Sequence, residues 1–150
     1  MSPEYALSGL FSTKSDVFSF GVIILEIICG KKNTAFYQHE EVSNLLGYAW
    51  KLWNEGNAMD LLDDSILVEC SKECEVLKCI NVGLLCVEED PNHRPSMPNV
   101  FLMLTDESMN LPKPNQPAFV TRNRIFNDST TLESDKLCSN QLTFSEQEGR

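Results

Sequence analysis

Residues 13–30, TKSDVFSFGVIILEIICG, decide the fold of this chain. Thr13 followed by Asp16 is typical of a capping box at the start of a helix, and Gly30 is a preferred helix stop. Between these signals, apolar side chains cover nearly the whole circumference of the predicted helix. A helix that is apolar all round belongs inside a core. We therefore expect other elements to surround residues 17–28 on every side.

The rest of the sequence predicts more helices and no strand. Pro3 favours a first helical turn over residues 3–6. Apolar residues recur at helical spacing in later segments. The segments are 44–55, 58–62, 70–87 and 97–104, and the inward side chains of the last are expected to be Val100, Phe101, Met103 and Leu104. After Met109, closely spaced prolines and then polar residues predict an irregular arm and a disordered tail. The predicted fold is all-α.

Composition narrows the classes of partner. The formal net charge of -10 argues against nucleic acid or an anionic membrane surface. No apolar run approaches the roughly 20 residues that a membrane span needs, so we expect no membrane segment. The six cysteines include no C-x-x-C pair, which favours free, buried thiols over a zinc site or disulfides.

Three motifs, in order, resemble those of the protein-kinase C-lobe. The first is Ser2-Pro3-Glu4-Tyr5, which is similar to the Ala-Pro-Glu end of the activation segment. The others are residues 14–21, KSDVFSFG, which are similar to the start of the central F helix, and residues 90–97, DPNHRPSM, which are similar to the arginine-bearing loop between the last two helices. Residues 112–119, PKPNQPAF, and the ending SNQLT through GR resemble plant S-locus-type receptor kinases, also called G-type lectin receptor-like kinases. The chain would divide into a partial kinase domain, 1–109, and the receptor-kinase tail, 110–150.

The resemblance implies roles for individual residues. Glu4 would pair with a buried Arg94 and tie the end of the activation segment to the helical core; the alternative is two unrelated surface charges. Asp16 would hold the backbone of the catalytic loop, a role compatible with its place in the helix cap. Trp50 and Trp53 are interpreted as core residues, or as part of a substrate-docking face.

Phosphoryl transfer requires motifs that these 150 residues do not contain. They have no Gly-rich loop, strand lysine, H-R-D aspartate or D-F-G aspartate. We therefore expect no catalytic, cofactor-binding or metal-binding residue, and no activity of this chain alone. Because Met1 falls where the family commonly has an internal methionine, the chain is interpreted as starting inside a longer reading frame, without the upstream kinase lobe.

The resemblance also implies a parent protein. That parent would use ATP and Mg²⁺ to phosphorylate Ser/Thr of protein substrates at the cytoplasmic side of the plasma membrane, and the fragment alone would be cytoplasmic. Two alternatives remain open at this point. The chain could be a non-catalytic interaction module or decoy for receptor kinases, or a non-functional truncation that hardly folds.

Overall fold

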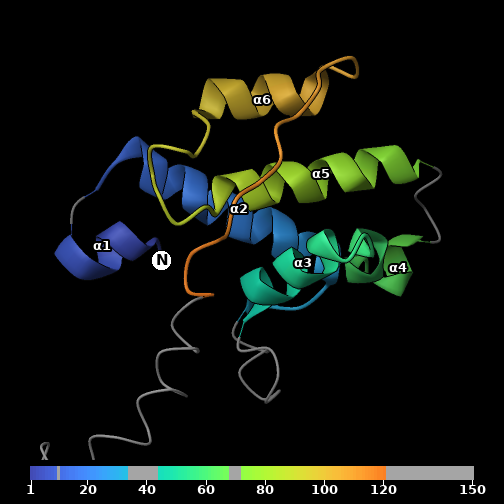
Figure 1. The fold of residues 1–150 in the computed structure, drawn as a ribbon, viewed down its shortest axis with the longest axis horizontal. Helices are drawn as coiled ribbons and strands as arrows, with labels where there is room; N and C mark the ends of the chain where they lie inside the picture. The colour runs from blue at the N-terminus through green and yellow to red at the C-terminus, as the bar shows by residue number, and fades with distance from the viewer. Residues whose placement is uncertain (10, 34–43, 68–71, 121–150) are drawn as a thin grey trace, which may run out of the picture. The chain divides into compact units, whose positions relative to one another are not determined.

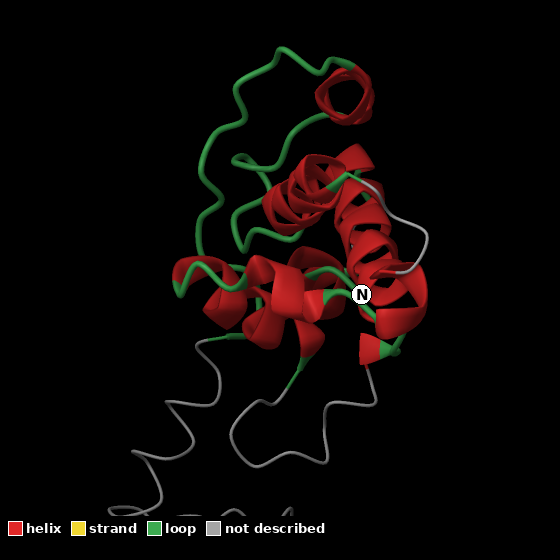
Figure 2. Cartoon of the chain, turned by 90° about the vertical axis from the view of Figure 1, so that its right-hand side faces the viewer, coloured by secondary structure: helices red, strands yellow, loops and turns green. Residues whose placement is uncertain are grey.

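The structure, a computed structural model, describes residues 1–9, 11–33, 44–67 and 72–120. Its elements are α1 (Pro3–Ser8), α2 (Thr13–Cys29), α3 (Leu45–Asn54), the 3-10 turn η2 (Ala58–Leu61), α4 (Asp64–Leu67), α5 (Glu73–Cys86) and α6 (Met97–Thr105) (Figure 1). Figure 2 shows helices and loops throughout these ranges. The only β-pairing in them is an isolated bridge between Glu88 and Pro117. The all-α prediction is confirmed, whereas the predicted tail disorder falls on 121–150, outside the described residues.

Helix α2 begins one residue earlier than the sequence suggested. Ser12 has extended backbone angles, and its hydroxyl accepts a hydrogen bond from the Ser15 amide at 3.2 Å. The prediction that Thr13 caps the helix is wrong, because Thr13 is already its first helical residue. The predicted stop is confirmed: Gly30 has a φ of 66°, in the left-handed region that glycine adopts without strain.

Helices α2 and α5 form the centre of the fold and approach closely where two glycines meet. A β-carbon on Gly21 would lie 2.6 Å from the Cys86 β-carbon and 2.9 Å from the Gly83 carbonyl oxygen. A β-carbon on Gly83 would lie 3.0 Å from the Leu25 side chain. The two backbones can come this near only because both positions lack a side chain.

The remaining elements cover this central pair from two directions. In Figures 1 and 2, α6 lies on one side of α5 and α3 on the other. The larger core cluster joins α2, α3, η2 and α5, and it is built around Phe18, Leu25, Leu45, Leu46, Ala49, Ile80 and Leu84. The smaller cluster joins α2, α5 and α6 through Val17, Val82, Leu85, Cys86, Val100 and Met103. Helices α2 and α5 contribute to both clusters, so this pair forms the common wall between them.

One side of α2 has no cover among the described residues, so the prediction that residues 17–28 are surrounded on every side is wrong. Ile23 is 52% exposed and Ile27 is 62% exposed. These two residues are four apart, so they lie on the same face of the helix. The prediction for Phe101 is wrong as well, because its side chain is 66% exposed. Phe101 sits about 100° around the helix from the buried Val100, which turns it away from α5.

No helix in the described ranges is both long enough and apolar enough to cross a membrane. Among the described cysteines, Cys29 and Cys86 have buried free thiols and Cys74 has an exposed one, while Cys79 is half-buried. Burial raises the pKa of the Cys86 thiol to about 12, so this side chain behaves as a small neutral core residue. The remaining two cysteines lie outside the described residues.

Candidate functional site

The site is centred on Arg94, which follows a tight turn between α5 and α6. The Asp90 carboxylate accepts hydrogen bonds from the Asn92 amide at 2.8 Å and from its side chain at 3.0 Å. The amides of His93 and Arg94 then donate to the carbonyls of Asp90 and Pro91. Aspartate and proline favour such turns: the aspartate side chain accepts a hydrogen bond from the backbone two residues on, and the proline ring fixes φ. The turn directs the Arg94 side chain into the interior, where it is only 1% exposed.

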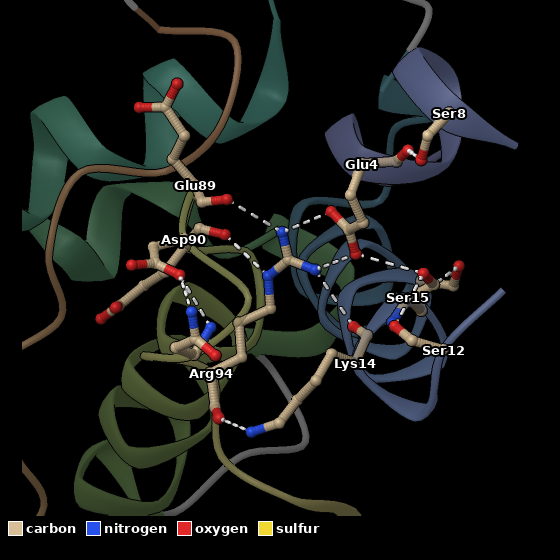
Figure 3. A network of polar contacts seen from close by, with 11 residues as sticks. Glu4, Ser8, Ser12, Lys14, Ser15, Glu89, Asp90 and Arg94 are labelled. Carbon is tan, nitrogen blue, oxygen red and sulfur yellow. Dashed lines mark hydrogen bonds and ion pairs between the residues drawn. The ribbon is translucent and has the colours of Figure 1, made fainter. Parts of the chain in front are cut away.

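Every N–H of the Arg94 guanidinium has an acceptor (Figure 3). Its Nε donates to the Glu88 carbonyl at 2.7 Å, and Nη2 donates to the Glu89 carbonyl at 3.1 Å. Nη1 also donates to the Lys14 carbonyl at 3.1 Å. The last two bonds go to the carboxylate of Glu4. An arginine has five such donors, so this buried group is fully satisfied.

Glu4 binds the guanidinium with both of its carboxylate oxygens. Arg94 Nη1 and Nη2 donate to Oε1 and Oε2 at 2.7 and 3.0 Å, and the Ser15 hydroxyl donates to Oε1 at 3.1 Å. Burial raises the pKa of Glu4, but hydrogen bonds from Arg94 and other neighbours, with the charge of Arg94, outweigh it and lower the pKa to about 2. Bidentate arginine–carboxylate pairs of this kind are stronger than hydrogen bonds between neutral groups. The structure therefore brings together the two residues that the motifs had paired.

Lys14 adds a second connection between α2 and the Arg94 turn. Its carbonyl accepts from the guanidinium, and its ammonium donates to the Arg94 carbonyl. The interactions of Arg94 with Glu4, Lys14, Glu88 and Glu89 are called the clasp below. The clasp joins α1, the first turn of α2 and the segment after α5.

An aromatic pair underlies the clasp. The guanidinium carbon of Arg94 lies 4.9 Å from the centre of the Phe18 ring, within the range of a cation–π contact. On Phe18, the Phe119 ring packs edge-on, with a centroid distance of 6.3 Å and an interplanar angle of 83°. Sequence reasoning missed this role of Phe119, since no local pattern links residues so far apart.

Asp16 takes no part in the clasp. Its side chain is exposed in the first turn of α2, and no hydrogen bond or ion pair to it is found among the residues that the structure describes. It lines a cavity of about 300 Å³ between the starts of α2 and α6. The other lining residues are Thr13, Val17, Ser96, Met97 and Pro98.

Trp50 and Trp53 are half-buried on α3 and pack against the larger core cluster. The core interpretation thus accounts for part of each ring, and the exposed part leaves the docking interpretation a prediction.

The cationic groups of the clasp are all engaged with protein oxygens. All donors of Arg94 already serve protein oxygens, and the Lys14 ammonium is bonded to the Arg94 carbonyl. Within the same residues, no three His, Cys, Asp or Glu side chains gather in a way that could hold a metal. The clasp can therefore fix segments of chain against one another.

Comparison with known families gives this geometry its context. The family model for protein tyrosine and serine/threonine kinases matches residues 1–104. The chain belongs to the protein kinase family.

The individual relatives are receptor-like kinases. A G-type lectin S-receptor-like serine/threonine-protein kinase of Arabidopsis thaliana is 53% identical over 154 residues, which cover 100% of this chain and 18% of the relative. Cysteine-rich receptor-like protein kinase 7 of the same plant is 48% identical over 141 residues, covering 94% of this chain and 21% of that one. The chain thus spans about a fifth of the length of these relatives. The resemblance to receptor-like kinases is confirmed.

A solved structure agrees with the fold. The pseudokinase domain of BIR2, described as an immune regulator of the RLK/Pelle family, matches with a TM-score of 0.57 and 26% identity. The match covers 69% of this chain and 31% of the BIR2 chain.

Proposed function

We propose that these residues form the helical base of a receptor-like Ser/Thr protein kinase domain, and that the clasp anchors the end of the activation segment to that base. The observation that carries the proposal is the fully satisfied, buried Arg94, bound to Glu4 on α1. A buried arginine is tolerated only when its charge and donors are matched. The site is therefore built to hold α1, which contains the Ala-Pro-Glu-like motif, in one position.

For the whole protein, we propose transfer of the γ-phosphate of ATP, with Mg²⁺, to Ser/Thr side chains of protein substrates. The names of the relatives, receptor-like serine/threonine kinases, support this activity and a place at the cytoplasmic face of the plasma membrane. Phosphoryl transfer depends almost entirely on positioned charges and metal ions. The 150 residues alone contain none of the required motifs, so the catalytic step belongs to other parts of a complete kinase.

Asp16 is proposed to hold the backbone of the catalytic loop in that complete domain. Its carboxylate is exposed at the start of α2 and has no partner within the described chain. It also borders a cavity, which leaves room for another segment to approach. A carboxylate at this place could accept two backbone N–H bonds of the charge-assisted kind.

A chimera tests this function directly. Residues 1–150 would replace the matching segment of the Arabidopsis kinase that is 53% identical, and phosphorylation of a Ser/Thr peptide would be measured. We expect an active kinase whose rate falls by about tenfold or more with Asp16→Asn, since a loosened catalytic loop misplaces the reacting groups. Asp60→Asn, at an exposed position of η2, is the matched control and should leave the rate unchanged.

Two results would contradict the proposal. One is an active chimera that is insensitive to Asp16→Asn. The other is micromolar binding of Mg-ATP by the unmodified 150-residue chain, measured by calorimetric titration, because these residues contain none of the nucleotide-binding motifs of a kinase.

The exposed face of α2 favours a second candidate, a non-catalytic interaction module. Ile23 and Ile27 are exposed on the same face of α2, and a partner polypeptide could extend an apolar contact over this face. This candidate predicts that the purified chain binds a recombinant receptor-kinase domain and that Ile27→Asp abolishes binding. Sharp thermal unfolding of the chain alone would argue against a truncation that hardly folds.

A further inference from the structure

The chain after α6, residues 106–120, is called the arm below. Part of the arm lies against residues 87–89, two of whose carbonyls accept hydrogen bonds from Arg94. In Figure 1 this arm, drawn in orange, runs from α6 across α5. Pro114, Pro117 and Ala118 on the arm are buried. The family model ends at residue 104, so the arm lies beyond the part of the chain that the family match covers, whereas residues 87–89 lie within it.

Hydrogen bonds fasten the arm to residues 87–89. The buried Glu88 side chain accepts from the Asn115 amide at 2.8 Å and from the Asn115 side chain at 3.2 Å. The Ala118 amide donates to the Val87 carbonyl at 3.0 Å. A further bond runs from the Glu89 amide to the Gln116 carbonyl at 3.4 Å. This side of the segment is therefore paired with the arm much as one strand pairs with another.

The same short segment holds Arg94 through its remaining carbonyls. Those of Glu88 and Glu89 accept from Nε and Nη2 of the guanidinium. Residues 87–89 thus lie between the arm and the clasp. A backbone bonded on both sides has little freedom to move, so the arm fixes the positions of two of the five acceptors that Arg94 uses.

Phe119 makes a second connection from the arm to Arg94. Its ring packs edge-on against Phe18, and the guanidinium lies over the Phe18 ring. Phe119 has a φ of 68°, and it is the one residue other than glycine with a positive φ in the described chain. Such a conformation is strained for a bulky residue and persists only where the surroundings determine it. The contacts of the arm are therefore strong enough to hold an unfavourable backbone.

We propose that residues Asn115–Phe119 are a positioning element for Arg94. Asn115 holds the Glu88 carboxylate, and the backbone of Gln116 and Ala118 holds Glu89 and Val87. The Glu88 and Glu89 carbonyls are thereby kept in place for Arg94. Phe119 in turn fixes the Phe18 ring, and both effects place the guanidinium within reach of Glu4. The relevance of this element to an activation segment rests on the proposed function, whereas its geometry can be tested in the 150-residue chain by itself.

The test is NMR on the isotope-labelled 150-residue chain, comparing Asn115→Ala with the unmodified protein. Asn115→Ala removes the side-chain bonds to the Glu88 carboxylate and keeps the backbone bond. At pH 6, the Arg94 Nε–H is expected to exchange with water at least about tenfold faster in the variant, because the Glu88 carbonyl that protects this N–H belongs to a residue that the arm then holds less firmly. The Glu4 carboxyl should titrate at a higher pH than in the unmodified chain, nearer its ordinary value of 4.5. A general loss of stability does not by itself move the pKa of a folded chain.

Two further variants keep the test decisive. Val100→Ala removes core contacts on α6, in the smaller core cluster and outside the Asn115–Phe119 contacts. It should lower the unfolding temperature without changing the Arg94 signal or the Glu4 titration. Phe119→Gly removes the ring and relieves the strained φ, so this variant can replace Asn115→Ala if the latter fails to fold. It should likewise speed the exchange of the Arg94 Nε–H and raise the pH at which Glu4 titrates.

The outcomes separate the two proposals. Unchanged Arg94 exchange and Glu4 titration in both arm variants would overturn the positioning role. The same result with Val100→Ala as with Asn115→Ala would overturn it too, since the effect would then be global. A released clasp in the arm variants, together with a chimera that is insensitive to Asp16→Asn, would support the positioning role and contradict the proposed function.

Discussion

Glu4→Gln is expected to destabilise the chain by about 3 kcal/mol at pH 7. The fall of the Glu4 pKa from its ordinary 4.5 to about 2 corresponds to about 3 kcal/mol, at about 1.4 kcal/mol for each tenfold change in proton affinity. An independent figure is similar: removing one partner of a buried ion pair costs about 3–5 kcal/mol. The lower end applies here, since the Arg94 side chain is 0% exposed but that of Glu4 is 23% exposed.

The same pKa defines the pH dependence. A carboxyl whose pKa is lower in the folded state stabilises fully above its unfolded pKa, and this contribution is lost as the pH falls toward the folded value. The contribution of Glu4 to the free energy of unfolding should therefore be fully present above about pH 5 and decline as the pH falls from 4.5 to about 2. The Glu4→Gln variant cannot lose it, so its stability should fall less steeply over this range.

Urea unfolding followed by tryptophan fluorescence at pH 7, 4.5 and 3 measures both effects. Hydrogen bonds from neighbouring Ser65, Asn92 and Ser108 also lower the pKa values of Asp63, Asp90 and Asp106. These groups titrate in both proteins, so the difference between wild type and variant isolates Glu4. Glu55→Gln, at an exposed position, is the matched control and should stay within about 0.5 kcal/mol of wild type. A Glu4→Gln variant equally close to wild type at pH 7, with the same loss on acidification, would refute the reasoning.

Three further substitutions test the fold. Ser12→Ala should cost about 1 kcal/mol in urea unfolding because it removes the α2 cap, and Thr13→Ala should cost clearly less; the reverse order would restore Thr13 as the cap. Gly21→Ala should cost about 3 kcal/mol or more, since its β-carbon would meet α5 at 2.6 Å. Gly47→Ala, with only ordinary contacts, serves as its control, and equal stability of the two variants would contradict the close crossing. Ile27→Gln should change thermal stability by less than about 0.5 kcal/mol, whereas a large loss would mean that this face of α2 is covered.

Local chemistry explains why much of the fold could be predicted. The end of α2 at Gly30 follows from a glycine that accepts a left-handed backbone, and the start of α6 follows from the Ser96 hydroxyl, which accepts from the Asn99 amide. The pairing of Glu4 with Arg94 came from motifs and not from such rules. Residues 90 positions apart have no local signal of contact.

The parts that sequence reasoning missed depend on tertiary contacts. Periodicity cannot say which side of α2 lacks a neighbour when nearly every side is apolar, so the exposure of Ile23 and Ile27 was not foreseen. A glutamate such as Glu88 is normally exposed. Its burial follows from a partner, Asn115, that is 27 positions away. The N-cap of α2 was predicted at Thr13 and not at Ser12 because the two residues carry equivalent hydroxyls. Only the backbone angles distinguish them.

The clasp bears most directly on α1. This helix has six residues and no buried side chain of its own, and so short a helix is not stable alone in water. Ser2, just before it, is buried, but the Ser2 hydroxyl has no hydrogen-bond partner. Glu4 therefore supplies the main polar attachment of α1 to the core. Loss of the clasp should release α1 first while α2, α5 and α6 remain packed, because none of the core clusters draws on α1. We therefore expect the buried Arg94 to control the order of the segment that contains the Ala-Pro-Glu-like motif, in agreement with the proposed anchoring of the activation segment.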